Sequence, residues 1–399
     1  MRARSAIALL GLALGLLAAV LAAGCGAKYQ LPTEHVQDKV VTGNGSYTLQ
    51  QIFDNMVDVQ DVLLTPRGAG SDLFVCFQHY GGTDPTLGNG AVLRYKLTEG
   101  KPIGPAVQGG IHNPGALAFG SGSGGDRLFV LDQGDTLNSK TLFFHPGPCD
   151  TCPPGIPTRW ITDLSRYWRV REYPTRSGDI VGALDTVSSF TDTTLAWVNG
   201  IAADDAGNVF VSGLADVSAP TNQPGIFTRV FVWKVYKYAR GPRYPGNVPG
   251  DPTMPGAAWH RDTTYFHTEG TGIGYVRDPR GMWWWNNPVP ALYIADFGNN
   301  SGEMVSDVDT TGYRRFELDG DGLPLIGPLD IATDASGYVY ICDTGNRRAL
   351  RFSPLGAFVQ PIADPVAPLL RPVAIAADDS IVYIGDRGRN QVLRFQRQK

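Results

Sequence analysis

The chain has 399 residues, of which 43% are hydrophobic and 18% are charged, so its composition excludes a disordered protein. Its formal net charge of −4 would become −6 on loss of residues 1–24, which hold two arginines and no acid. An acidic chain lacks the clustered cations that contact phosphates, so no nucleic-acid partner is expected. The 49 glycines and 29 prolines favour many turns between short β-strands.

The first 24 residues have the layout of an export signal. Two arginines precede a charge-free run rich in Leu and Ala at residues 5–24, and small residues end that run before Cys25. The segment resembles the lipobox of bacterial lipoproteins, which implies cleavage before Cys25, acylation of that residue and anchoring in membrane lipid, with residues 25–44 as a tether. Gly26 stands where inner-membrane lipoproteins usually carry Asp, so the resemblance implies the outer membrane of a two-membrane envelope. An uncleaved anchor or an ordinary signal peptide is the alternative.

One hydrophobic strand motif recurs six times within residues 45–399. The copies occupy residues 73–77, 128–132, 209–213 and 292–296, and the last two end at Asp343 and Asp386. Their alternation of Val, Ile, Leu and Tyr with small or polar residues is typical of β-strands. A repeated small sheet predicts an all-β, six-bladed β-propeller.

A second strand-like segment precedes each copy and is expected to line the centre of the ring. These segments are residues 62–65, 116–119, 200–203, 273–276, 329–333 and 373–377. The sixth unit has only three strands, whereas residues 45–52 are strand-like and belong to no unit. We therefore expect this N-terminal strand to complete the sixth blade and close the ring, which removes exposed sheet edges.

The turn after the motif resembles the Asp-x-Gly-Asn-x-Arg turn of NHL repeats. The match is closest at residues 343–348 and 386–392 and is fair at residues 296–300. The resemblance implies an NHL-type propeller used for binding, although related six-bladed lyases, lactonases and esterases are enzymes.

Four motif copies end in Asp, at Asp132, Asp296, Asp343 and Asp386. Such carboxylates can accept backbone N–H bonds across a tight turn, so a structural role is expected. A ring of metal ligands is the alternative.

Polar residues near the innermost strands are candidate ligands at the mouth of the central channel. They are Asp61, His112, Asn113, Asn199, Glu269 and Asp330. Metal-dependent propeller hydrolases resemble one another in drawing Asn, Asp and Glu ligands from several blades, and oxygen ligands suit Ca²⁺. An enzyme of this kind needs three or more of these residues within a few ångströms of one another at the channel mouth. A polar rim without catalytic function needs no such cluster. No catalytic residue is assigned, and no other cofactor is expected.

The cysteines outside the export signal fall into two groups. Cys149 and Cys152 lie in a proline-rich stretch, where a local disulfide is expected in an oxidising compartment. Cys76 and Cys342 occupy the same column of the repeat and are expected to be buried small residues.

Long segments at residues 78–90, 146–196, 213–227 and 240–270 are expected to build up one face of the ring. The second carries aromatic and arginine residues typical of interfaces: Trp160, Tyr167, Trp168, Arg169 and Arg171.

Three consecutive tryptophans, Trp283, Trp284 and Trp285, are expected between the first two strands of the fourth unit. Adjacent side chains cannot all face one way on a strand, so at least one is available to stack on a sugar or pack against a partner. A hydrophobic plug beneath an insertion is the alternative.

These features favour a lipid-anchored binding or scaffold protein of the cell envelope over an enzyme. Its loop-built face would bind a protein, peptide or polysaccharide. The rival interpretation is a propeller hydrolase or lyase with a central Ca²⁺, because this fold hosts both classes.

Overall fold

The computed structural model describes the chain in a series of segments. They are residues 34–36, 46–65, 72–78, 90–97, 101–108, 111–122, 125–134, 140–144, 159–163, 168–174, 188–192, 194–217, 219–220, 227–228, 231–240, 259–286, 289–306, 313–363 and 368–398. Among these residues, no helix has the length and apolar character needed to cross a membrane.

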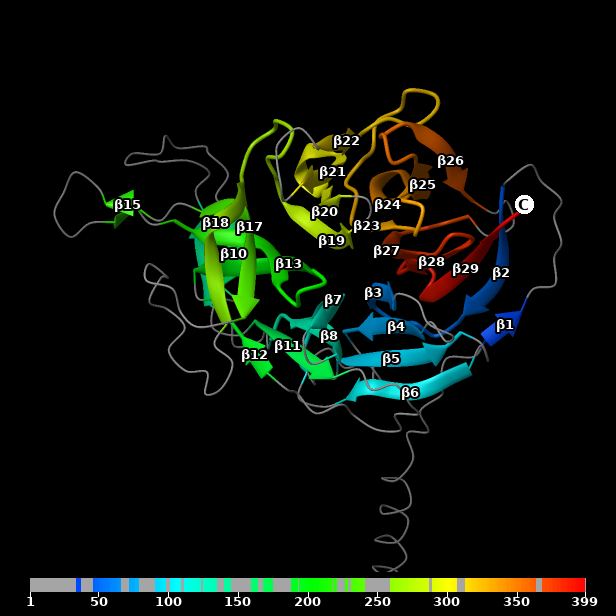
Figure 1. Ribbon diagram of the computed structural model, residues 1–399, viewed down its shortest axis with the longest axis horizontal. Helices are drawn as coiled ribbons and strands as arrows, with labels where there is room; N and C mark the ends of the chain where they lie inside the picture. The colour runs from blue at the N-terminus through cyan, green and yellow to red at the C-terminus, as the bar shows by residue number, and fades with distance from the viewer. Residues whose placement is uncertain are drawn as a thin grey trace, which may run out of the picture. The chain divides into compact units, whose positions relative to one another are not determined.

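Six antiparallel sheets are arranged as blades around a common centre, which confirms the predicted six-bladed β-propeller (Figure 1). Blade one contains β3 (Val59–Leu64), β4 (Asp72–Phe77), β5 (Ala91–Lys96) and β6 (Lys101–Gln108). Blade two contains β7 (Pro114–Gly122), β8 (Gly125–Asp132), β11 (Arg169–Pro174) and β12 (Ser188–Phe190). Blade three contains β13 (Leu195–Ala203), β14 (Val209–Asp216), β17 (Phe231–Arg240) and β18 (Trp259–Thr268).

The remaining blades follow the same order along the chain. Blade four contains β19 (Pro279–Asn286), β20 (Pro290–Asp296), β21 (Ser301–Ser306) and β22 (Arg314–Phe316). Blade five contains β23 (Asp330–Thr333), β24 (Val339–Asp343), β25 (Arg348–Phe352) and β26 (Phe358–Ile362). Two small hairpins stand apart from the blades: β9 (Lys140–Phe144) with β10 (Arg159–Asp163), and β15 (Ala219–Pro220) with β16 (Phe227–Thr228).

The sixth blade joins the two ends of the ring. It contains β27 (Pro372–Ala377), β28 (Ile381–Asp386) and β29 (Gln391–Arg397), followed by the N-terminal strands β2 (Tyr47–Phe53) and β1 (Glu34–Val36). β2 pairs antiparallel with β29, and its Leu49 and Phe53 side chains are buried. The predicted closure by an N-terminal strand is therefore confirmed.

The second strand of each blade is the most buried part of the molecule. All six residues of β4 and all five of β24 are buried. These strands are covered on both faces by the neighbouring blades, so they need hydrophobic residues at almost every position. This burial explains why the repeated motif was recognisable in the sequence.

The predicted innermost strand of blade four is wrong. Residues 273–276 form a turn, in which the Tyr275 N–H donates to the Gly272 carbonyl and Gly274 has a φ of 83°. The innermost strand is instead β19, which contains the three tryptophans. They therefore line the channel side of the blade and do not form a link between its first two strands.

Three expected loop segments overlap blade strands, since residues 213–227 begin within β14. Residues 240–270 include β18, the outermost strand of blade three, so the expectation of a face-building loop is wrong for that part. Residues 146–196 include β10, β11 and β12. The proposed lipidation site Cys25 and the proposed disulfide pair, Cys149 and Cys152, lie outside the described residues.

The four repeated Asp side chains are buried and accept hydrogen bonds within their own blades. Each accepts a backbone N–H bond from the loop that precedes the innermost strand of its own blade, 15–20 residues earlier in the chain. Asn299 and Asn346 add side-chain bonds to Asp296 and Asp343. These contacts agree with the expected structural role. Asp132 also accepts the Gly134 N–H in the following turn at 3.1 Å, whereas the N–H donors of the other three Asp residues belong to the preceding loop.

Candidate functional site

The innermost strands place six equivalent positions around the central channel. Strand register equates Asp61, Ala116, Gly200, Gly281, Asp330 and Ala374. The blades approach one another closely here: a Cβ atom added to Gly281 would lie 2.0 Å from an Asp330 carboxylate oxygen. Two of these six positions carry carboxylates, and both were among the sequence candidates.

Asp61 and Asp330 connect neighbouring blades in the same way. Asp61 accepts the N–H of Leu117 in blade two at 2.6 Å and that of Val62 at 2.7 Å. Asp330 accepts the N–H of Ile375 in blade six at 2.7 Å and that of Ile331 at 2.9 Å. Each carboxylate therefore uses one oxygen to hold the first strand of the next blade and the other oxygen to accept an N–H of its own strand.

The two carboxylates also influence each other electrostatically. Burial raises the pKa of the Asp61 carboxyl to about 7, against the opposing effect of its two backbone hydrogen bonds. Burial raises the pKa of Asp330 well above its ordinary value, and the negative charge of Asp61 raises it further. Asp61 and Asp330 thus form a buried acid pair that retains a proton at a pH where isolated Asp residues are ionised.

Replacement of Asp61 by Asn is expected to reduce the dependence of stability on pH between 3.8 and about 7. The raised pKa means that the folded chain binds more protons than the unfolded chain in this window. This contribution to the free energy of unfolding is full below the window and is lost as the pH rises through it. Urea unfolding at about pH 5 and about pH 8 measures the difference. The exposed substitution Asp321→Asn is the control, and equal pH slopes for wild type and D61N would refute the assignment.

The cysteines of the repeat lie beside this pair. Cys76 and Cys342 are the strand partners of Asp61 and Asp330, and both are fully buried free thiols, as expected. Burial, followed by the nearby carboxylates, raises both thiol pKa values. These thiols remain protonated and are unsuited to nucleophilic chemistry.

The other candidate ligands do not join the pair. Asn199 donates to Asp278 and to the Pro279 carbonyl, both at 2.9 Å, and so ties blade three to blade four. His112 is exposed, and the Asn113 side chain bonds Gln133 at 3.4 Å within blade two. Exposed Glu269 follows the outermost strand of blade three and accepts the Trp233 N–H.

The described residues do not assemble the three-ligand calcium site. No group of three or more His, Cys, Asp or Glu side chains among them is placed to hold a metal ion. Asp61 and Asp330 come together, but their oxygens already accept backbone N–H bonds.

The expected binding-face residues of blade two have other roles where they are described. Trp168 is fully buried, its indole N–H donates to the Leu195 carbonyl at 3.0 Å and its ring packs on Phe190. Trp168 therefore packs inside its own propeller and does not lie on a binding face. Arg171 pairs with Asp132 at 3.1 Å, and Arg169 is half-buried. Trp160 lies in β10, and Tyr167 is outside the described residues.

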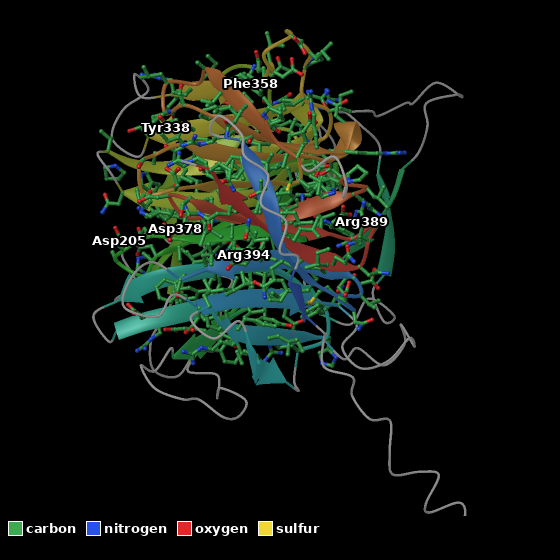
Figure 2. The ribbon with its side chains drawn as sticks, turned by 90° about the vertical axis from the view of Figure 1, so that its right-hand side faces the viewer. Asp205, Tyr338, Phe358, Asp378, Arg389 and Arg394 are labelled. Carbon is green, nitrogen blue, oxygen red and sulfur yellow. The ribbon has the colours of Figure 1, made fainter. Side chains whose placement is uncertain are left out.

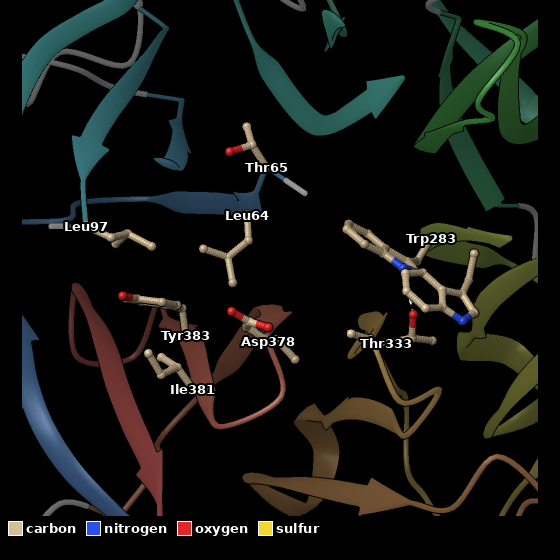
Figure 3. Close-up of a pocket in the computed structure, with 11 residues that line it drawn as sticks. Leu64, Thr65, Leu97, Trp283, Thr333, Asp378, Ile381 and Tyr383 are labelled. Carbon is tan, nitrogen blue, oxygen red and sulfur yellow. Dashed lines mark hydrogen bonds between the residues drawn. The ribbon is translucent and has the colours of Figure 1, made fainter. Parts of the chain in front are cut away.

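Two hollows open at the end of the channel where the innermost strands finish. The larger has a volume of about 270 Å³ and is lined by blades two, three and four, including Leu117, Phe119 and Met282. The smaller, of about 60 Å³, is lined by blades one, four, five and six (Figure 3). Both are bordered by Trp283 and Trp285, which makes β19 their shared wall.

The three tryptophans take different positions along β19. Trp283 donates its indole N–H to the Thr333 hydroxyl at 2.9 Å, and Trp284 stacks on Phe210 with ring centroids 5.1 Å apart. All three are only partly buried as whole residues. The indole nitrogens of Trp284 and Trp285 are buried and have no hydrogen-bond acceptor within the described part of the chain. This end of the channel therefore combines aromatic surface with two unused N–H donors.

Acidic residues border the same end. Asp378 lines the smaller hollow and Asp205 lines the larger one. Figure 2 shows both residues on one side of the molecule and Arg389 on the other. Sequence reasoning missed these acids, although both follow shortly after the end of an innermost strand, β13 or β27. It also missed Tyr383, which lies within β28 and lines the smaller hollow.

No family model matches the chain, and no curated protein matches it. Among solved structures, it is similar to a virginiamycin B lyase from Staphylococcus aureus, with 10% identity, a TM-score of 0.45 and coverage of 88% of this chain and 99% of the other. It is also similar to a gluconolactonase from Xanthomonas campestris, with 12% identity, a TM-score of 0.45 and coverage of 87% of this chain and 90% of the other. A third similar structure is an auxiliary nutrient binding protein from Bacteroides ovatus, with 13% identity, a TM-score of 0.46 and coverage of 93% of this chain and 76% of the other. These similarities concern the propeller fold and assign no activity.

Proposed function

We propose that this protein is an extracytoplasmic binding protein, anchored in the membrane through Cys25, whose ligand site is the tryptophan-lined end of the propeller channel. The observation that carries the proposal is the pair of hollows that share Trp283 and Trp285. Ligand sites are typically apolar concavities with a few polar groups that orient the ligand. The hollows would bind either a small molecule or one group of a larger ligand. That group would be a side chain of a protein or peptide, or a sugar ring of a polysaccharide.

Binding is favoured over catalysis by the way in which the channel carboxylates are used. Both oxygens of Asp61 and of Asp330 already accept backbone N–H bonds, one from the next blade and one from the same strand. At the other end, the hollows offer aromatic surface, which suits recognition of a ring or branched apolar group.

Trp285→Ala is expected to weaken binding of a neutral apolar probe, 3,3-dimethylbutan-1-ol, by about tenfold, equivalent to about 1.4 kcal/mol. The indole forms part of both hollows, so its removal deletes surface that the probe contacts. Titration followed by intrinsic tryptophan fluorescence and by calorimetry measures the change.

Trp233→Ala is the matched control, because Trp233 is partly buried in blade three but lines neither hollow. The control should bind the probe as the wild type does. Absence of binding to the wild type, or equal loss in both variants, would refute this site.

The second candidate function is a metal-dependent hydrolase or lyase. It is favoured by one observation, the two carboxylates of Asp61 and Asp330 at equivalent positions of the innermost strands. Metal content of the purified protein, with thermal melts before and after chelation, tests this function. One bound Ca²⁺ per chain and a large melting shift on chelation would support it, whereas no metal and no shift would refute it.

A further inference from the structure

The smaller hollow differs from an ordinary apolar pocket because a carboxylate opens into it. Its lining combines the aromatic side chains of Trp283, Trp285 and Tyr383 with Leu64, Ile381 and Asp378 (Figure 3). Neither hollow has a lysine, arginine or histidine among its described lining residues. The site therefore presents negative charge beside aromatic rings.

Asp378 has lost the structural role of its counterparts in the repeat. In blades three and five, Asp204 and Asp334 end the innermost strand, are buried, and accept N–H bonds from residues two and four positions later. The turn of blade six is one residue shorter, since the Asp378 N–H pairs with the Ile381 carbonyl, whereas Asp334 pairs with Tyr338.

The shorter turn leaves the Asp378 carboxylate available. Its Oδ1 accepts one bond, from the Asp379 N–H at 2.7 Å, and the side chain is exposed. No ion pair joins it to any cation of the described residues. Asp204 and Asp334, by contrast, lie 3.7 Å from Lys237 and 3.6 Å from Arg351.

We infer that the hollows bind an organic cation: an ammonium group carried on an apolar body. Asp378 supplies the opposite charge and the aromatic rings supply cation–π attraction in the smaller hollow. The apolar body packs against Trp283 and Trp285, which also border the larger hollow of about 270 Å³. This inference rests on the proposed function, because it specifies the ligand class of the same site.

Choline and 3,3-dimethylbutan-1-ol form a matched pair of probes, which have the same shape and differ by the positive charge. Calorimetric titration of the purified protein should give choline an affinity about tenfold higher than that of the neutral alcohol. Asp378→Asn should lower this ratio to about two- or threefold, because Asn keeps the bond to Asp379 and removes the charge, while the cation–π attraction of the rings remains. Asp379→Asn changes an exposed neighbouring acid and should leave the ratio unaltered.

The outcomes separate this inference from the proposed function. Equal affinities for the two probes, or an unchanged ratio in D378N, would overturn the cationic ligand while leaving the hollow as a binding site. Absence of binding by both probes would overturn the site and the inference together. A ratio that falls equally in D378N and D379N would assign the effect to general surface charge and would also overturn the inference.

Discussion

Phe53→Ala is expected to lower the free energy of unfolding by about 3–5 kcal/mol, which is the usual loss for a fully buried aromatic residue. Phe53 lies in the closing strand β2 and is 2% exposed. Its ring is 5.2 Å from that of Tyr95 in blade one and 6.3 Å from that of Tyr383 in blade six. The substitution leaves a cavity at the junction where the ring closes. Urea denaturation followed by circular dichroism measures the loss.

Gln50→Ala is the matched control on the same strand. Its side chain is half-buried and makes a local bond to Thr48 at 3.1 Å, so its removal should change stability by less than about 1 kcal/mol. Comparable losses for the two variants would show that the junction does not depend on Phe53.

Asp343→Ala is expected to destabilise the fold by about 2–4 kcal/mol, because it leaves buried donors without an acceptor. Asp343 is fully buried and accepts the Ile326 N–H at 2.7 Å. Its other oxygen accepts the Asn346 amide at 2.8 Å and the Arg348 guanidinium at 2.6 Å. The partial exposure of Arg348 reduces the loss, since water replaces part of that contact.

Thermal and urea unfolding of D343A test this prediction against Asp321→Ala. Asp321 is exposed, and the bond that its residue makes to Asp319 uses the backbone N–H, which alanine keeps. The prediction fails if both variants unfold at the same urea concentration.

The blade count was predictable because it depends on local pattern. Second strands such as β4 and β28 are buried along nearly their whole length, so each appears as a short hydrophobic run. The position of the fourth innermost strand was not recognised, because the residues of 273–276 also fit a strand pattern. The missed signal is a proline at the start of the innermost strand. In four blades a proline stands three residues before a buried hydrophobic residue of that strand: Pro114 before Leu117, Pro279 before Met282, Pro328 before Ile331 and Pro372 before Ile375. Proline suits the start of a strand, where no ladder N–H is required.

The candidate site was predictable only where it followed the repeat. Asp61 and Asp330 were recognised because they stand at the start of innermost strands, but their partners, Leu117 and Ile375, are 56 and 45 residues away. Asn199 has its own distant partner, Asp278, which no local pattern reveals. The hollows were beyond prediction because residues from all six blades form their walls.

The pairing of β2 with β29 determines when the molecule can finish folding. Thr48 bonds the Gln396 carbonyl across 348 positions of sequence. Contacts between such distant segments form slowly, since a long loop must close before they contribute. Because synthesis starts at the N-terminus, β2 is complete long before its partner and stays an unpaired edge, open to aggregation, until the last blade is made.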